Sequence, residues 1–329
     1  GNYSKVIALR AMPNVFEGQG TADEPFLIKS KDDMLKLAKF TNTEAYPFSG
    51  RHFKVLNDID FGSTTYECVG VDAGSFNGDF NGNGKKFLNI NNTYTSTQSN
   101  RGLFGNVGPQ GAVHDLTVAS GTITGYRYNG GVAGSVYGKV YNCQNYANIY
   151  SESSAAAGIA GYVKNGGSVV NCQNHGKVDS KGNYLAGIAY YVEKGALVEN
   201  CENDTTIGYE KKNGVGGIAT YSYGTIRNCV NKGTLAGLST IGGILANSYG
   251  GDSILYCTNE GEIQSTGSSV GGILGTGRKS LAPVVITGCH NTAAVTGKGY
   301  LGGVAGRLYE GSVLTDCYNT GDVTSISST

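Results

Sequence analysis

Residues 157–180 read AGIAGYVKNGGSVVNCQNHGKVDS, and this stretch contains the pattern that decides the fold. Three short apolar pieces, around Ile159, Val169 and Val178, are separated by turns rich in Gly, Asn and Lys. None of these pieces is long enough for a helix, and each has the length of a short strand. The stretch therefore predicts three strands joined by tight turns.

This stretch belongs to a repeat that is centred on a cysteine. The recurring cysteines are spaced 29, 29, 28, 28, 32 and 28 residues apart, and they are Cys143, Cys172, Cys201, Cys229, Cys257, Cys289 and Cys317. Each has an aliphatic residue three positions before it and another six positions after it. Each is also followed, two positions on, by an asparagine: Asn145, Asn174, Asn203, Asn231, Asn259, Asn291 and Asn319. A Gly-rich block such as Gly158–Gly161 precedes each cysteine, and a degenerate earlier copy has Leu116 in the cysteine position.

A period of about 28 residues predicts the architecture. A unit this short cannot close a core alone, but stacked units can align their strands and share one interior. A propeller blade needs about 40 residues or more, and a leucine-rich repeat needs its leucine lattice. The sequence therefore predicts an all-β, single-domain, right-handed parallel β-helix of roughly ten coils, the hand following from the twist of L-residue strands.

The repeat pattern is lost before residue 100, and we divide the chain accordingly. We expect an N-terminal tail at 1–15, an N-terminal cap with irregular first coils at 16–100, and repeat coils of the same β-helix domain at 101–329. Ser30, with an acid three residues later, resembles a capping box, so we predict a short amphipathic helix at 31–41 that covers the open end of the solenoid. Residues 81–84, Asn-Gly-Asn-Gly, are predicted to form a turn.

Several of these segments resemble the GLUG-repeat proteins of bacterial surfaces. The resemblance rests on Asn57–Phe61, on Phe76–Gly84, and on tetrads such as Gly102–Gly105 and Gly158–Gly161, and it covers roughly residues 16–325. It implies a surface-exposed right-handed β-helix of adhesin-like character. It supplies no catalytic residues.

Composition excludes several classes of partner. Lys and Arg total 25 and Asp and Glu total 25, so the basic field that nucleic acid or anionic lipid would select is missing. The sequence contains no run of 18 apolar residues, so it predicts no membrane-spanning helix. The sequence opens at Gly1 without a methionine, and we expect that a leader has been removed from an extracellular or cell-surface protein.

The cysteines and asparagines predict structure instead of chemistry. One Cys per coil gives a line of thiols about 4.8 Å apart, which is neither a tetrahedral metal site nor the geometry of a disulfide. We therefore expect buried free thiols, an inward ladder of Asn amides at a bend, no metal site and no cofactor.

Catalytic patterns are weak. The four histidines occur outside any His-Glu-x-x-His motif, which excludes that class of metalloprotease; they are His52, His114, His175 and His290. Hydrolysis of sugars needs two facing carboxyl groups. Acids gather only at Asp58, Asp60, Asp72 and Asp79, where a bridging turn is favoured over a catalytic or cation site. We expect no enzyme activity. Two alternatives to a binding protein are kept open: a polysaccharide lyase or glycoside hydrolase, and a passive structural spacer.

A series of tyrosines gives the best candidate for binding. Tyrosines follow the Gly-rich blocks by a few residues, and they are Tyr137, Tyr162, Tyr191, Tyr221, Tyr223, Tyr249 and Tyr309. Exposed along one edge, they would form aromatic platforms for a glycan or for a host or cell-surface protein. The alternative is that tyrosine simply suits strands. Longer units, with extra residues at 209–213 and 278–281, would frame such a site.

The C-terminal coil lacks a predicted cap. Residues 324–329 are mostly Ser and Thr, which are too small to bury a coil cross-section. We therefore expect this end to favour end-to-end self-association.

Overall fold

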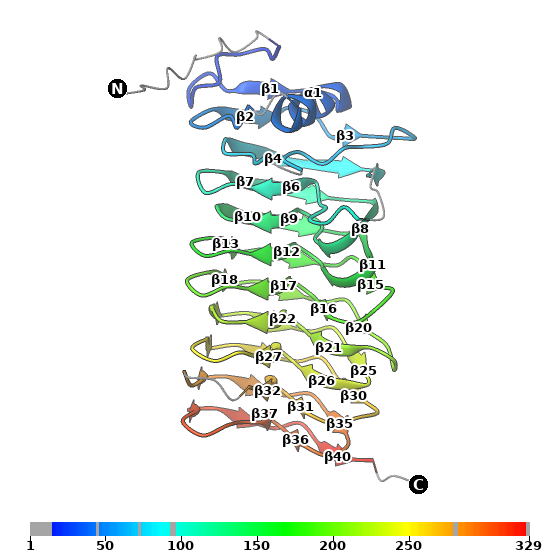
Figure 1. The fold of residues 1–329 in the computed structure, drawn as a ribbon, viewed down its shortest axis with the longest axis vertical. Helices are drawn as coiled ribbons and strands as arrows, with labels where there is room; N and C mark the ends of the chain where they lie inside the picture. Colours follow the sequence, from blue (N-terminus) through cyan, green and yellow to red (C-terminus); the bar gives the residue numbers. More distant parts are fainter. Residues whose placement is uncertain (1–14, 44–45, 72–73, 93–96, 279–281, 327–329) are drawn as a thin grey trace, which may run out of the picture.

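The computed structural model describes residues 15–43, 46–71, 74–92, 97–278 and 282–326, which wind into a parallel β-helix of about ten coils (Figure 1). The coils stack along one long axis, with the first and last strands at opposite ends of the stack. This confirms the all-β solenoid predicted from the repeat. Residues 1–14 of the predicted N-terminal tail lie outside the described residues.

Three sheets run along the solenoid. The first contains β1 (Phe26–Ile28), β2 (His52–Val55), β3 (Ile59–Asp60), β4 (Asp79–Leu88), β7 (Ala112–Val118), β10 (Lys139–Asn145), β13 (Ser168–Val170), β14 (Gln173–Asn174), β18 (Leu197–Glu199), β19 (Glu202–Asn203), β23 (Thr225–Arg227), β24 (Val230–Asn231), β28 (Ser253–Leu255), β29 (Thr258–Asn259), β33 (Val285–Thr287), β34 (His290–Asn291), β38 (Val313–Thr315) and β39 (Tyr318–Asn319). The second contains β5 (Ile90–Asn91), β8 (Gly121–Asn129), β11 (Asn148–Ala157), β15 (Val178–Ser180), β16 (Leu185–Ala186), β20 (Ile207–Gly208), β21 (Asn213–Gly216), β25 (Leu235–Gly237), β26 (Ser239–Gly242), β30 (Ile263–Ser265), β31 (Val270–Gly271), β35 (Val295–Gly297), β36 (Leu301–Gly302) and β40 (Val323–Ser325). The third contains β6 (Phe104–Val107), β9 (Ala133–Val136), β12 (Ala160–Val163), β17 (Ala189–Val192), β22 (Ala219–Ser222), β27 (Leu245–Ser248), β32 (Leu274–Gly277) and β37 (Ala305–Arg307).

Equivalent residues of successive repeats pair in register. Val140 lies beside Val169, and Val169 lies beside Val198, in parallel pairing. Ile149 and Val178 pair in the same way in the second sheet. These side chains are buried, so the aliphatic positions flanking each cysteine form continuous columns in the interior.

The cysteines form the inward column that the period predicts. All eight are free thiols; Cys68 and the six from Cys143 to Cys289 are buried, and Cys317 in the end coil is half-buried. Their thiols bond to backbone carbonyls, as when Cys172 Sγ donates to Val170 O at 3.3 Å. Burial raises the pKa of the Cys172 and Cys201 thiols well above the usual range, so both stay protonated and inert.

The asparagines two residues after each cysteine form the predicted ladder. Asn174 Nδ2 donates to Asn203 Oδ1 at 3.1 Å, and Asn203 Nδ2 donates to Asn231 Oδ1 at 2.9 Å. Each amide also donates to a carbonyl two residues further along, such as Thr205 O at 2.9 Å from Asn203. The ladder therefore satisfies buried polar groups at a bend in every repeat coil.

The Gly-rich blocks are explained by this ladder. Gly217 has ordinary backbone angles, yet a Cβ atom placed on it would lie 2.5 Å from Asn231 Cγ and 2.0 Å from Gly243 O. The equivalent glycines lie equally close to their own ladder Asn. Glycine is required at this position by the close approach of two backbones and an amide, and not by a left-handed backbone.

The residue before each cysteine position has left-handed backbone angles. From the coil of Cys172 onward this residue divides the first-sheet strand into two pieces, as between β13 and β14. The column, with φ between 51° and 63°, comprises Asp115, Asn142, Asn171, Asn200, Asn228, Tyr256, Gly288 and Asp316. Asn, Asp and Gly tolerate this conformation best. Tyr256 is the exception, and its side chain is 62% exposed.

The N-terminal end is covered by the predicted helix, α1 (Lys31–Asn42), whose Met34, Leu37 and Ala38 are buried against the first coils (Figure 1). The capping box differs from our prediction. The Ser30 hydroxyl donates to the Asp33 carboxylate at 3.1 Å and makes no bond to a helix N–H. None of the described helices has the length and apolarity needed to cross a membrane.

The first coils are irregular, as expected, and their interior is aromatic. Phe53 packs on Phe26, Phe48 and Phe76 with ring centroids 5.1 to 5.8 Å apart. The turn predicted at residues 81–84 is instead an irregularity inside the long strand β4, where the pairing with β7 shifts register between Asn81 and Lys85. Asn83 and Gly84 provide the left-handed backbone that it needs.

The opposite end of the described solenoid presents apolar side chains. Val313, Leu314 and Val323 in the last coil are 42%, 45% and 43% exposed. Ile286 and Val295, which pair with Leu314 and Val323, are buried, whereas Val285, which pairs with Val313, is half-buried. The end-to-end self-association predicted for this face stays a prediction.

Candidate functional site

Three neighbouring strands place tyrosines at paired positions on the outside of the third sheet. Tyr162 in β12 pairs with Tyr191 in β17, which pairs with Tyr221 in β22. The rings of Tyr162 and Tyr191 stack 4.6 Å apart at 18°. Ala160 and Val163, on either side of Tyr162, are buried in the core, so the strand is held while the ring lies outside.

A second pair of rings lies beside the first column, in the turns that follow β22 and β27. Tyr223 and Tyr249 stack 4.9 Å apart at 9°. Tyr249 lies 5.2 Å from Tyr221 and 6.2 Å from Tyr191, measured between ring centroids. The two columns are therefore one continuous surface.

Three further tyrosines, which our sequence reasoning missed, extend this surface. Tyr190 lies 5.6 Å from Tyr128 and 5.6 Å from Tyr221, and Tyr184 lies 5.3 Å from Tyr221. Tyr128, near the end of β8, and Tyr184, just before β16, have positive φ angles of 58° and 72°. In the sequence, the adjacent tyrosines at 190 and 191 are the feature that could have indicated this larger cluster.

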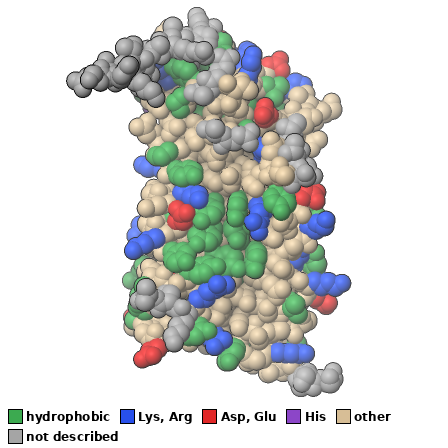
Figure 2. Space-filling model, in the orientation of Figure 1, with side chains coloured by type: hydrophobic (Ala, Val, Ile, Leu, Met, Phe, Trp, Pro, Cys, Tyr) green, Lys and Arg blue, Asp and Glu red, His purple; other side chains and the backbone are tan. Residues whose placement is uncertain are grey.

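We call this surface the tyrosine face: Tyr128, Tyr162, Tyr184, Tyr190, Tyr191, Tyr221, Tyr223 and Tyr249. Figure 2 shows a field of hydrophobic side chains over the middle coils, at the level of β12, β17, β22 and β27 in Figure 1. Basic side chains border the field. This is the largest aromatic cluster outside the core among the described residues.

Two of the seven predicted tyrosines lie apart from the tyrosine face. Tyr137 is 38% exposed, and its ring centroid lies 5.9 Å from Lys164 Nζ. Tyr309 lies beneath Arg307, whose guanidinium carbon is 4.8 Å from the ring centroid. The structure thus brings together Tyr162, Tyr191, Tyr221, Tyr223 and Tyr249 from the predicted set. They are less exposed than predicted, because their rings pack on one another: Tyr221 is 5% exposed and the other four are half-buried.

Cationic groups lie over the borders of the tyrosine face. Lys164 Nζ is 3.6 Å from the centroid of Tyr162, and the guanidinium carbon of Arg278 is 4.4 Å from the centroid of Tyr249. Each contact attracts a cation to the electron-rich face of a ring. Lys164 is also 3.4 Å from Glu193, a carboxylate on the same border.

The phenols of the face are neutral hydrogen-bonding groups. Burial raises the pKa of Tyr162, Tyr190, Tyr191 and Tyr221 far above the usual value of 10, and neighbouring tyrosines raise it further. Each phenol therefore keeps its proton and can both donate and accept.

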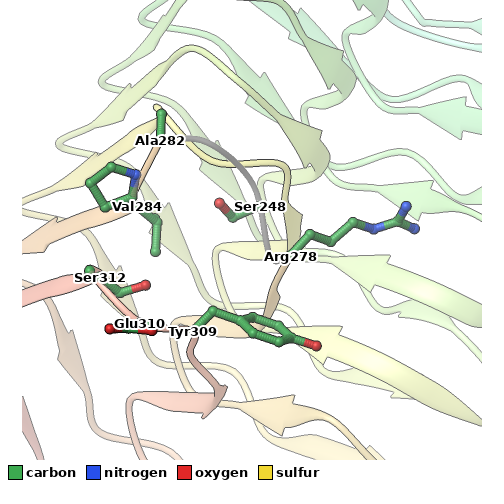
Figure 3. A pocket seen from close by; sticks show the side chains of 9 residues that line it. Ser248, Arg278, Ala282, Val284, Tyr309, Glu310 and Ser312 are labelled. Atoms are coloured by element: carbon green, nitrogen blue, oxygen red, sulfur yellow. The ribbon is translucent and has the colours of Figure 1, made fainter.

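A cavity of about 420 Å³ is lined by Ser248, Arg278, Val284, Tyr309, Glu310 and their neighbours (Figure 3). In this view the Arg278 side chain extends away from Val284 and Ser312. Glu310 is the single carboxylate among the described lining residues. Of the predicted insertion at 278–281, residues 279–281 lie outside the described residues.

The acidic residues near the N-terminus mainly accept hydrogen bonds in turns. Asp58 accepts a bond from the Lys86 backbone N–H at 2.9 Å, and Asp60 accepts from Gly62 N–H and from Asn89, both at 2.8 Å. These bonds are the bridging-turn role that we favoured. Asp72 lies outside the described residues.

Asp79, in contrast, joins two histidines. His52 Nδ1 lies 3.1 Å and His114 Nε2 lies 3.2 Å from its carboxylate oxygens, and His114 Nδ1 lies 2.7 Å from Asp115. Hydrogen bonding to His114 lowers the pKa of Asp79. Burial opposes a charged His114 ring, but the bonds to both carboxylates raise its pKa above the usual 6.5. Among the described residues no group of three or more His, Cys, Asp or Glu is arranged to hold a metal ion.

Comparison with known proteins identifies one sequence motif and one fold. The GLUG motif matches residues 297–324. A crystal structure of "a putative immunoglobulin A1 protease" from Bacteroides ovatus superimposes with a TM-score of 0.59, covering 75% of this chain and 79% of that one. The two sequences are 19% identical, so this likeness shows the shared fold alone.

Two curated proteins are similar over part of the chain. A "Putative Gly-rich membrane protein" of Evansella cellulosilytica is 31% identical over 135 residues, which are 38% of this chain and 15% of that protein. "Halomucin" of Haloquadratum walsbyi is 31% identical over 140 residues, which are 39% of this chain and 2% of that protein. The matched segment is thus a small part of each relative.

Proposed function

We propose that this chain, whose residues 297–324 match the GLUG motif, is an adhesin-like binding protein of the cell surface or extracellular space, and that its tyrosine face holds a glycan or protein ligand. Its similarity to a relative named a membrane protein, and to one named halomucin, supports an exterior location. The formal net charge of the chain is zero, so binding at this face depends on the local groups and not on the field of the whole chain.

The observation that carries the proposal is the continuity of the tyrosine face. Its eight rings touch one another across adjacent coils, while the backbone beneath them is fixed by pairing on both sides. Tyrosine gives a large contact area with little loss of side-chain entropy, and its hydroxyl group supplies polar contacts. A rigid surface of this kind binds without first having to order itself.

We propose that the protein binds without catalysing a reaction. Asp58 and Asp60 are occupied by turn bonds, and the cavity beside Arg278 offers only Glu310 among its described lining residues. Cleavage of a glycosidic bond by the common mechanism needs two carboxyl groups. The purified protein should therefore release no sugar, unsaturated product or peptide from a polysaccharide panel or from immunoglobulin A1. Reproducible release of any of these would favour the enzyme alternative.

Binding is tested on a glycan array and a panel of cell-surface proteins with three variants. Tyr191 is central to the face, so Tyr191→Ala should weaken binding at least about tenfold, as loss of an aromatic hot spot does. Tyr191→Phe keeps the ring and should retain most of the affinity.

The matched control is Tyr146→Ala. Tyr146 is 48% exposed and its ring stacks on His175 at 4.4 Å, away from the tyrosine face. Its removal should leave binding unchanged. A ligand whose binding responds to Tyr146→Ala and ignores Tyr191→Ala would place the site elsewhere, and an array with no ligand would favour the passive spacer.

A further inference from the structure

The extent of the tyrosine face limits what can occupy it. From Tyr128 to Tyr249 the rings span four coil spacings, or about 19 Å along the axis. Seven of the eight tyrosines are half-buried and Tyr221 is 5% exposed, so the rings present less area than the roughly 800 Å² that a stable protein partner usually contributes. The face therefore suits one extended chain better than a globular protein.

An extended peptide also lacks its usual means of attachment here. Such peptides add a strand to an open sheet edge and gain affinity from main-chain hydrogen bonds. In the third sheet, the strands from β9 to β32 are each paired on both sides, so the tyrosine face contains no open edge. A polymer that binds through ring stacking and hydroxyl bonds, as a polysaccharide does, needs no such edge.

Two arginines mark the ends of the face. The guanidinium carbon of Arg127 lies 5.8 Å from the centroid of Tyr128, and that of Arg278 lies 4.4 Å from the centroid of Tyr249. Among the described residues, neither guanidinium makes an ion pair with a carboxylate. From β8 to β31 there are five ladder steps, so the two arginines are separated along the axis by about 24 Å.

A carboxylate on the border of this surface, Glu193, is already occupied. Glu193 accepts a bond from the Asn165 backbone N–H at 2.9 Å and lies 3.4 Å from Lys164. The phenols along the face are protonated and can donate to anionic oxygens. The face thus combines neutral donors in its centre with unpaired guanidinium groups at its ends, and guanidinium groups bind carboxylates and sulfates in a two-pronged geometry.

We propose that the ligand of the tyrosine face is a linear acidic polysaccharide that lies along the solenoid axis, with its sugar rings on the tyrosines and its acid groups paired to Arg127 and Arg278. This inference rests on the proposed function, because it names the ligand class of the same face. The shared chemistry is an anionic oxygen on a sugar chain, supplied by a carboxylate or a sulfate.

The test compares acidic polymers with their neutral counterparts by isothermal titration calorimetry. The probes are polygalacturonate against its methyl ester, and dextran sulfate against dextran. At least one acidic polymer should bind about tenfold or more tightly than its neutral counterpart, and its affinity should fall as salt is added. The acidic polymer that binds more tightly identifies the acid group.

Arg127→Gln and Arg278→Gln should each weaken binding of the acidic polymer about tenfold, because each removes a charge-assisted contact. Arg278→Lys should restore part of the loss. The control is Lys177→Gln, which removes one exposed charge at the start of β15, outside the tyrosine face.

Each remaining outcome overturns the inference. If neutral and acidic polymers bind equally while Tyr191→Ala still abolishes binding, the proposed function stands and the acidic ligand is wrong. If none of the polymers binds, or if Lys177→Gln weakens binding as much as Arg278→Gln, specific pairing with the arginines is wrong. If poly-L-glutamate binds as tightly as the acidic polysaccharide, the ligand is an acidic peptide.

Discussion

Replacing one asparagine of the ladder should destabilise the solenoid strongly. Asn203 is fully buried; it donates to Thr205 O and Asn231 Oδ1, both at 2.9 Å, and accepts from Asn174 Nδ2 at 3.1 Å. Asn203→Ala removes three bonds of about 1 kcal/mol each and leaves the buried Asn231 oxygen without its ladder donor, which adds about 1 to 2 kcal/mol. The expected loss in the free energy of unfolding is roughly 3 to 5 kcal/mol.

The same column provides a matched control in the end coil. Asn319 is exposed, accepts one bond from Asn291 and donates to Gly321 O. Since water can replace these partners, Asn319→Ala should cost about 1 kcal/mol or less.

Urea unfolding, followed by tyrosine fluorescence and circular dichroism, measures both variants of the ladder. The chain contains no tryptophan, so tyrosine gives the fluorescence signal. Equal losses for the inner and the end asparagine would refute the argument that burial and stacking set the energy. So would a loss below about 1 kcal/mol for Asn203→Ala.

Three further outcomes are expected. Gly217→Ala places a Cβ 2.0 Å from a carbonyl oxygen of the next coil, so it should cost about 3 kcal/mol or more; an unchanged urea midpoint would contradict this. Tyr256→Asn relieves a left-handed backbone strain at an exposed site and should stabilise by about 1 kcal/mol in the same assay; a destabilised variant would show that the ring contributes more than the strain. Because the pKa of Asp79 is lowered in the folded protein, its contribution to the free energy of unfolding is lost as pH falls below about 4. Because the pKa of His114 is raised, its contribution is lost as pH rises above about 6.5. The stability that this pair provides should therefore be greatest between these two pH values. Asp79→Asn should flatten this pH dependence, measured as the urea midpoint plotted against pH. A profile identical to that of the unchanged protein would show that the pair does not stabilise the fold.

The fold could be predicted from the sequence because one residue type recurs at one spacing. Cys172 and Asn174 share side-chain parity, so an inward cysteine implied an inward asparagine, and the ladder confirms it. The function of Gly158 and its equivalents could not be read in the same way. Glycine is required at these positions because of contact with an asparagine 14 to 19 residues further along, as between Gly158 and Asn174, which only the wound coil brings together.

The tyrosine face could be predicted in part. Tyr162, Tyr191 and Tyr221 occupy equivalent repeat positions, and pairing in register necessarily aligns them. Tyr190 stands where the neighbouring coils have Gly161 and Thr220, so no repeat pattern marks it. The contacts of Asp79 with His52 and His114 arise in the irregular first coils, where no repeat period marks the positions that meet.

Hydroxyl-radical footprinting tests the central claim, that the tyrosine face is the binding site. The tightest ligand from the array is added to the protein, and oxidation of each tyrosine is measured by mass spectrometry. Oxidation of Tyr191, Tyr223 and Tyr249 should fall on binding, while oxidation of Tyr146 and Tyr256, which are 48% and 62% exposed elsewhere, should not change. Unchanged oxidation of Tyr191 together with protection of Tyr146 or Tyr256 would contradict the account.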